Sequence, residues 1–314
     1  MSDTPEIATE KTPPALIVGE NEPIAPGAPL FVKGRSLWED ARRRLLRNPA
    51  AILSLIVLSF LVFLAIFGPW VWVYKVEQID KAHVAIAPTW ENAHVLGTDG
   101  NGRDMLARIM FGLRISLSVG LVATSVAMII GVAYGATAGY VGGVVDEIMM
   151  RIVDVLYTLP FIFLVIILVV VFGSNIWLIF AAIGAVEWLT MARIVRGQTI
   201  ALRRREFIEA ARASGSTTSH IIASHIAPNV LGPVIIYTPL NIPAVILAES
   251  FLSFLGLGVQ EPLTSLGQLI SIGAHEMDRA PWMLLFPSLT MFITLMCLNF
   301  LGDGLRDALD PKDR

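Results

Sequence analysis

The sequence predicts an all-α integral membrane protein with six transmembrane helices, and three observations support that prediction. The first is composition: 55% of the 314 residues are apolar and only 16% are charged, which exceeds what a soluble domain buries. The second is a series of apolar runs of about 20 residues, the length of a helix that crosses a bilayer. The third is the unequal distribution of Lys and Arg between alternate loops.

The apolar runs divide the chain into a tail and one transmembrane domain. Residues 1–34 are acidic and rich in proline, without the basic start and apolar stretch of a cleavable signal, so we expect a disordered tail. Residues 35–314 form the transmembrane domain. The length criterion places its spans at about 50–74, 115–140, 153–173, 176–197, 231–256 and 281–302.

The basic residues orient these spans. If the tail is cytoplasmic, 17 of the 23 Lys and Arg residues lie on the cytoplasmic side, so both termini are predicted inside. Three basic residues just before the second span lie on the outer side, and we expect them in an amphipathic segment at the membrane interface: Arg103, Arg108 and Arg114. Prolines at the edges of spans or inside them should kink helices: Pro160, Pro233, Pro239, Pro243 and Pro287.

A charged stretch, EFIEAARASG at 206–215, interrupts the apolar pattern within the cytoplasmic loop 198–230. Helical spacing places Phe207 and Ala211 on one face, whereas the charged residues recur on another: Glu206, Glu209 and Arg212. Gly215 can adopt the left-handed conformation that ends a helix. The stretch therefore predicts a short docking helix that faces the cytoplasm, and the alternative is an ordinary solvated loop helix.

The loop resembles that of a known family. Glu209-Ala210-Ala211, Gly215 and Pro228 match the EAA loop of permease subunits in bacterial ATP-binding-cassette (ABC) importers, and SHIAPNV at 224–230 is similar to the variant of the peptide and nickel branch. Five further segments resemble the OppC-type membrane component of oligopeptide permeases: RSLWEDARRRLLRN (35–48), GTDGNGRDMLARI (97–109), ARIVRGQ (192–198), ESFLSFLGLGVQEP (249–262) and NFLGDGLRDALDPKDR (299–314).

The resemblance implies a type I importer (MetI-like) permease fold in the bacterial inner membrane. It implies a subunit that forms half of the pathway of an ATP-driven peptide importer, together with a second homologous permease, two ABC ATPase subunits, an extracytoplasmic peptide-binding protein and membrane lipid, with no nucleic acid. The loop would be the coupling helix, with Glu209 and Arg212 at its rim and Phe207 and Ala211 inserted into an ATPase groove. The coupling residues so implied are Glu206, Phe207, Glu209, Ala210, Ala211, Arg212, Gly215 and Pro228.

No catalytic motif is apparent. A P-loop needs Gly-Lys followed by Ser or Thr, and the lysine that precedes such a residue is Lys11, which follows Glu10. HEMD at 275–278 lacks the second histidine of a helical zinc motif, because Arg279 stands there. We therefore expect a transport subunit that binds no metal or cofactor, with ATP and Mg²⁺ used by partner ATPase subunits.

Two acids fall within predicted spans. An ionisable group at such depth should face protein or water, so Glu187 and Glu249 are candidate pathway residues, with a buried hydrogen bond that fixes helix register as the alternative. Further candidates are Tyr237, Thr238, Asn241 and Ser253. Glycines at four-residue spacing in the second span predict close helix packing: Gly131, Gly135 and Gly139. The outer segments 77–98 and 260–281 are candidates for contacting the binding protein.

The alternatives to a peptide importer differ in what they require of the sequence. The same architecture could import nickel or another solute such as a glycoside. A stand-alone secondary transporter or channel would need an ion-linked acid pair and inverted repeats, neither of which is apparent. An intramembrane hydrolase would need a nucleophile and a base on facing helices.

Overall fold

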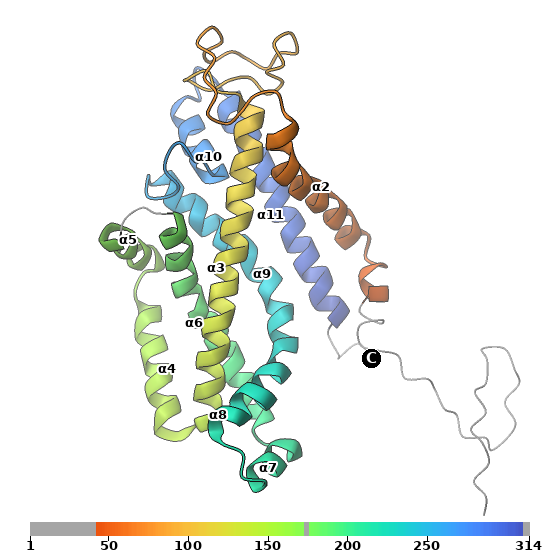
Figure 1. The fold of residues 1–314 in the computed structure, drawn as a ribbon, viewed down its shortest axis with the longest axis vertical. Helices are drawn as coiled ribbons and strands as arrows, with labels where there is room; N and C mark the ends of the chain where they lie inside the picture. The colour runs from red at the N-terminus through yellow and green to blue at the C-terminus, as the bar shows by residue number, and fades with distance from the viewer. Residues whose placement is uncertain (1–41, 173–175, 310–314) are drawn as a thin grey trace, which may run out of the picture.

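Helices make up the regular structure of the described chain. The computed structural model describes residues 42–172 and 176–309, so the predicted tail at 1–34 lies outside the described residues. The helices lie roughly side by side, and loops gather at one end (Figure 1). In chain order they are α2 (Pro49–Val71), α3 (Met105–Val141), α4 (Gly143–Thr158), α5 (Phe161–Phe172), α6 (Ile176–Leu202), α7 (Glu206–Ala213), α8 (Thr218–Ile221), the π-helix η1 (Ile222–Ile226), α9 (Ala227–Phe254), α10 (Leu266–His275) and α11 (Trp282–Leu309).

Four continuous helices in the described residues are long and apolar enough to cross a membrane: Pro49–Val71, Met105–Val141, Thr218–Phe254 and Trp282–Leu309. Each overlaps one of the predicted spans. Local sequence sets their starts. Asn48 accepts hydrogen bonds from the N–H groups of Ala50 and Ala51 at 3.1 and 3.2 Å, and Pro49 occupies the first helical position of α2.

The helix α3 begins ten residues before the predicted second span, because Asp104 caps it by accepting from the Ala107 N–H at 2.8 Å. The predicted amphipathic interface segment is therefore wrong. Arg108 lies inside the helix with 2% of its side chain exposed and forms an ion pair with Asp99. Arg103 instead pairs with Glu261, with two nitrogen–oxygen distances of 2.9 and 3.2 Å.

The span predicted over 153–173 is divided in the structure. The helix α4 ends at Thr158, Leu159 is extended with φ −73° and ψ 132°, and α5 starts after Pro160. A residue that precedes proline is pushed out of the helical region, which explains the break. Figure 1 shows α5 turned across the direction of α4. The prolines of α9 and α11, in contrast, lie inside continuous helices: Pro233, Pro239, Pro243 and Pro287.

The predicted glycine packing face is confirmed and lies between α3 and α6. A Cβ atom added to Gly131, Gly135 or Gly139 would lie 2.6, 2.4 and 2.8 Å from the nearest atom, each time an atom of α6. The atoms met are Met191 Cβ, Ala192 O and Arg196 O. The two backbones therefore approach closely along several turns, and α3 and α6 form one closely packed pair.

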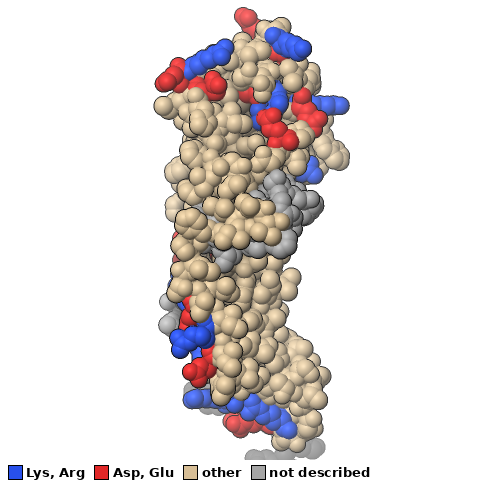
Figure 2. Space-filling view, turned by 90° about the vertical axis from the view of Figure 1, so that its left-hand side faces the viewer, with Lys and Arg blue, Asp and Glu red and all other residues tan. Residues whose placement is uncertain are grey.

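The outer surface of the bundle is largely apolar. Large apolar side chains are exposed along α2, including Ile56 at 61% and Trp70 at 81%. In Figure 2 the charged side chains gather towards the two ends, and a band without charge lies between them. A soluble monomer rarely exposes so extensive an apolar area, whereas a membrane protein presents it to lipid or to partner helices.

Candidate functional site

The short helix α7 lies at the end of the bundle opposite the long loops (Figure 1). One residue attaches it to the bundle: Ile208 is fully buried, in a cluster with Ala136 and Tyr140 of α3 and Val195 of α6. Sequence reasoning missed Ile208, because its partners lie in distant segments. A displacement of α7 would therefore reach α3 and α6 through packed side chains.

A second attachment comes from Arg212. Its Nε donates a hydrogen bond to the Tyr140 hydroxyl at 3.0 Å, and its guanidinium lies 4.8 Å from the centre of the same ring. The prediction assigned Arg212 to the rim of a partner contact. The structure uses this side chain to hold α7 against α3.

Several other residues of α7 present a free face. Glu206, Glu209 and Ala210 are exposed and Ala211 is half-buried, while 42% of Phe207 is accessible. Phe207 is therefore available to a partner, whereas Ala211, predicted on the same inserting face, packs against the buried cluster around Ile208. Whether these residues couple to an ATPase stays a prediction.

Gly215 ends this helix as predicted. Its φ is +82°, its N–H donates to the Arg212 carbonyl at 3.0 Å, and the Ser216 N–H donates to the Ala211 carbonyl at 3.1 Å. This pair of bonds is a Schellman motif, which leaves the end of α7 well defined. No atom lies within 4 Å of a Cβ placed on Gly215, so the left-handed conformation alone requires glycine here.

The chain returns to the bundle through an irregular helix. Thr217 starts α8 by accepting from the His220 N–H at 3.4 Å, and a π-helical turn follows at Ile222–Ile226. Pro228 has no N–H to donate to the Ser224 carbonyl, and the π-turn lies where this bond would form. The helix thus begins well before the predicted span at 231–256, and Pro228 is exposed at its start.

A polar cavity of about 500 Å³ lies beside α7. Arg203, Arg204 and Arg212 line it together with the acids Asp146 and Glu209, and glycines at the α3–α4 turn form one wall. Arg196 binds Asp146 through two hydrogen bonds of 2.6 and 2.7 Å, which ties α6 to α4 next to this cavity. Charge is therefore concentrated where α7 meets the bundle.

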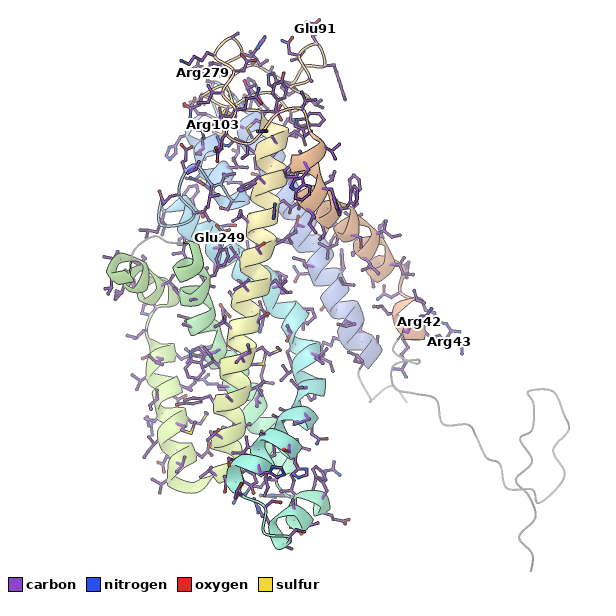
Figure 3. The ribbon with its side chains drawn as sticks, in the orientation of Figure 1. Arg42, Arg43, Glu91, Arg103, Glu249 and Arg279 are labelled. Atoms are coloured by element: carbon purple, nitrogen blue, oxygen red, sulfur yellow. The ribbon has the colours of Figure 1, made fainter. Side chains whose placement is uncertain are left out.

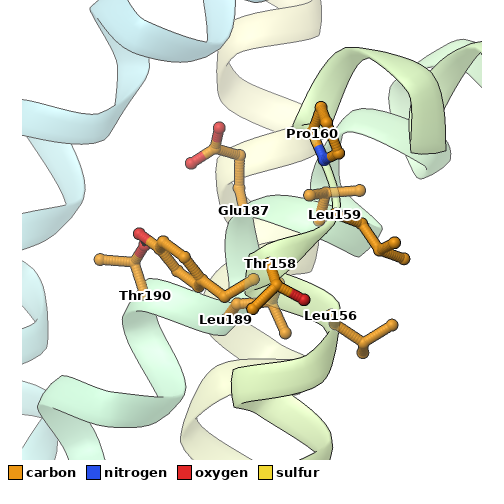
Figure 4. A pocket seen from close by; sticks show the side chains of 9 residues that line it. Leu156, Thr158, Leu159, Pro160, Glu187, Leu189 and Thr190 are labelled. Atoms are coloured by element: carbon orange, nitrogen blue, oxygen red, sulfur yellow. Dashed lines mark hydrogen bonds between the residues drawn. The ribbon is translucent and has the colours of Figure 1, made fainter.

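The predicted pathway residues fall into different environments. Glu187 of α6 is half-buried and lines a cavity of about 360 Å³ with the end of α4, including Tyr157 and Thr158 (Figure 4). Tyr237 and Asn241 are half-buried. Thr238 is also half-buried, and its hydroxyl donates to the Val234 carbonyl of its own helix at 2.8 Å. Their roles in transport stay predictions.

Glu249 is the centre of a buried network below the loop end of the bundle (Figure 3). Its carboxylate accepts from the Ser253 hydroxyl at 2.6 Å and from the Ser116 hydroxyl of α3 at 3.4 Å. The Ser116 oxygen in turn accepts from the Leu266 N–H at 3.2 Å, and Ser265 caps α10. This network joins α3, α9 and α10, which favours the structural alternative for Glu249, and Ser253 belongs to the same network.

The network yields a prediction. We expect Glu249→Leu to lower stability by about 1–3 kcal/mol, because the buried Ser116 and Ser253 hydroxyls lose their acceptor. Glu249→Gln keeps one acceptor oxygen and should lose less. Thermal unfolding of the purified protein and its abundance in the membrane measure both. Glu91→Leu, at an exposed position, is the control, and equal losses in Glu249→Leu and this control would contradict the network's role.

The loop end of the bundle contains the two segments proposed to contact a binding protein. Trp90 is 83% exposed there. The Trp282 indole, in contrast, donates to the Thr98 carbonyl at 3.1 Å and so links the start of α11 to the loop before α3. The Arg103 guanidinium holds the pKa of the Glu261 carboxyl below its usual range. This ion pair connects the loop after α9 to the start of α3.

Long apolar helices, with a short helix at one end and buried polar networks within, define a helical membrane protein. Comparison with known proteins gives the family. Residues 127–314 match the model described as the binding-protein-dependent transport system inner membrane component, and residues 36–88 match the N-terminal TM domain of oligopeptide transport permease C. The chain belongs to the family of binding-protein-dependent transport system inner membrane components.

Individual relatives agree. The chain is 56% identical over 285 residues to the oligopeptide transport system permease protein OppC of Escherichia coli K12, covering 91% of this chain and 94% of that protein. It is 42% identical over 280 residues to the dipeptide transport system permease protein DppC of Bacillus subtilis, covering 89% and 87%. A structure of the inward-facing MetNI methionine ABC transporter covers 66% of this chain and 98% of its own, with a TM-score of 0.52 at 20% identity, which supports the type I importer fold.

Proposed function

We propose that this chain is a permease subunit of an ATP-driven peptide importer, in which it forms half of the translocation pathway. The observation that carries the proposal is the 56% identity over most of the chain to a protein named as an oligopeptide permease. The similarity to a permease supports a transport subunit rather than an enzyme. The same similarity gives no support to a stand-alone secondary transporter.

The proposed assembly has four kinds of partner. A second, homologous permease completes the pathway, two ABC ATPase subunits use ATP and Mg²⁺, an extracytoplasmic peptide-binding protein delivers the cargo, and lipid surrounds the helices. The termini and α7 face the cytoplasm in this proposal, in accord with the distribution of Lys and Arg. The loops at the other end then face the binding protein.

Coupling is proposed to run through α7. Its exposed face, with Phe207 and Glu209, would dock on an ATPase subunit, while Ile208 and Arg212 hold it to α3 and α6. Closure of the ATPase dimer would then move α7 and the bundle together. A short helix with a well-defined C-terminal end and a packed base transmits such a displacement, and a loose loop would not.

Uptake assays test the cargo. Cells that lack this gene, with and without a plasmid copy, are supplied with labelled di-, tri- and pentapeptides and with nickel. We expect the loss of uptake of the longer peptides, restored by the plasmid. Loss of nickel uptake with intact peptide uptake would assign the same architecture to a metal cargo, and unchanged uptake of every compound would refute the proposed function.

A further inference from the structure

Three side chains with metal-binding atoms meet in the loop between α2 and α3, at the end of the bundle opposite α7. They are Asp80, His83 and His94, and their ligand atoms all lie within 4.8 Å of one another. Asp80 and His83 are partly exposed, with 29% and 33% of their side chains accessible, whereas the His94 ring is 1% exposed. The cluster thus has a buried base and an open side.

A carboxylate fixes the His94 ring. Its Nδ1 lies 2.9 Å from one Asp104 oxygen, and the other oxygen accepts from the Trp72 indole at 2.9 Å and from the Ala107 N–H at 2.8 Å. Tyr74 stacks on the ring with 4.3 Å between the centres. Since Asp104 acts as an acceptor in each contact, the His94 proton belongs on Nδ1, and Nε2 carries a free lone pair.

The Nε2 atom of His94 is buried and has no hydrogen-bond partner. It points to the cluster, where the Asp80 Oδ2 atom lies 3.8 Å away. A buried nitrogen without a partner is costly in a folded protein. A histidine whose other nitrogen donates to a carboxylate is the usual arrangement around a bound metal, because the carboxylate fixes the tautomer and raises the basicity of the ligand nitrogen.

We propose that Asp80, His83 and His94 bind a zinc ion, with one coordination position open to water or to a partner. Zinc prefers nitrogen and oxygen ligands of this kind at about 2.0 Å, so two ligand atoms of a tetrahedral site lie about 3.3 Å apart. The Asp80 Oδ2 atom is 2.7 Å from His83 Nδ1 and 3.8 Å from His94 Nε2, values that bracket this spacing. Small side-chain rotations would complete the site.

The neighbours of Asp80 and His83 suit such a site. The Asp80 Oδ1 atom accepts from the Ala82 N–H at 3.0 Å, which leaves Oδ2 facing the two histidines. The Nε2 atom of His83 lies 2.9 Å from the Asn92 amide. When His83 Nδ1 binds zinc, its proton is carried on Nε2, and the Asn92 amide can rotate to present its oxygen as the acceptor. Both histidines then have a supporting side chain behind them.

The test measures zinc directly. The full-length chain, in the complex in which it purifies and without a histidine tag, is dialysed against zinc sulfate and then against metal-free buffer, and zinc per chain is measured by mass spectrometry. We expect about one tightly held zinc per chain. Co²⁺ in place of zinc should give the visible absorption of a tetrahedral site.

Variants locate the metal. His83→Ala and Asp80→Asn should each lower zinc affinity by at least about 100-fold, since each removes a ligand. His83→Cys retains a ligand and should add a thiolate-to-cobalt absorption band. His275→Ala, an exposed histidine at the same end of the bundle, and His220→Ala at the other end are matched controls that should keep the zinc. Absence of bound zinc in the parent protein, or its retention by His83→Ala, would overturn the proposal.

Discussion

Gly215→Asp is expected to abolish ATP-driven peptide uptake while the chain still inserts in the membrane. At φ +82° a residue with a Cβ atom is strained by about 1–2 kcal/mol, and the Schellman bonds that end α7 would loosen. The added carboxylate would also face the surface proposed for the ATPase. Uptake should fall by at least about tenfold, the size of a typical coupling between two sites. Peptide uptake in cells and the amount of permease in isolated membranes measure the two outcomes.

The control for this prediction is Gly256→Asp. Gly256 has φ +78° and, as at Gly215, open space at the position of a Cβ atom, but it follows α9 at the other end of the bundle. It therefore experiences the same strain away from the proposed ATPase contact. Equal uptake by the Gly215→Asp variant and the parent would refute the coupling role. An equal loss of uptake in both glycine variants would also contradict it, because backbone strain alone would then explain the loss.

Glu209→Lys tests the same surface by charge. Glu209 lines a cavity with Arg203, Arg204 and Arg212, so a lysine here adds a fourth cation and removes an acid. We expect loss of transport with normal insertion. ATP hydrolysis by the reconstituted complex, measured with and without binding protein, should no longer respond to cargo. Stimulation by cargo equal to that of the parent would show that Glu209 is not part of the coupling contact.

The second large effect is expected from Gly135→Val. A Cβ atom at position 135 would lie 2.4 Å from the Ala192 carbonyl oxygen, a backbone atom that cannot rotate away. The helices α3 and α6 must separate, and overpacking of this kind costs about 1–3 kcal/mol or more. We expect a lower unfolding temperature in detergent and less permease in the membrane.

Gly197→Val is the matched control. Gly197 lies on α6, the partner helix, and a Cβ atom there would meet nothing within 4 Å. The same change in side-chain volume should therefore leave the unfolding temperature close to that of the parent. If the two valine variants unfold alike, close packing of α3 on α6 does not limit stability.

The sequence indicated the long helices because hydropathy is a local property. It placed the start of α3 too late because Arg114 bounds the uncharged run, and Arg108 is a second charge before it. The partner that allows the charge of Arg108 to be buried, Asp99, lies outside the helix. The break at Pro160 was anticipated only as a kink, because the direction that α5 takes depends on its neighbours. Capping by Thr217 was a local signal that could have placed the start of α8.

The local features of the candidate site were predicted, whereas its long-range contacts were not. Helical spacing anticipated the exposed face of α7, and the glycine at 215 anticipated its end. The role of Ile208 and the contact of Arg212 with Tyr140 depend on residues about 70 positions earlier, which periodicity does not reveal. The histidine cluster was missed because Asp80, His83 and His94 follow no familiar ligand spacing. Asp104, the residue that orients His94, appeared in the sequence only as part of a family segment.

The three internal prolines of α9 leave its backbone short of donors. Proline has no N–H, so the carbonyls of Asn229, Ile235 and Pro239 lack their usual helical partner. In a hydrocarbon environment such oxygens must face water or protein donors, which gives α9 a preferred side independent of its side chains. A solute that moves along this side would meet acceptors provided by the main chain. Substitutions of other side chains in α9 would then leave these main-chain hydrogen-bond acceptors in place.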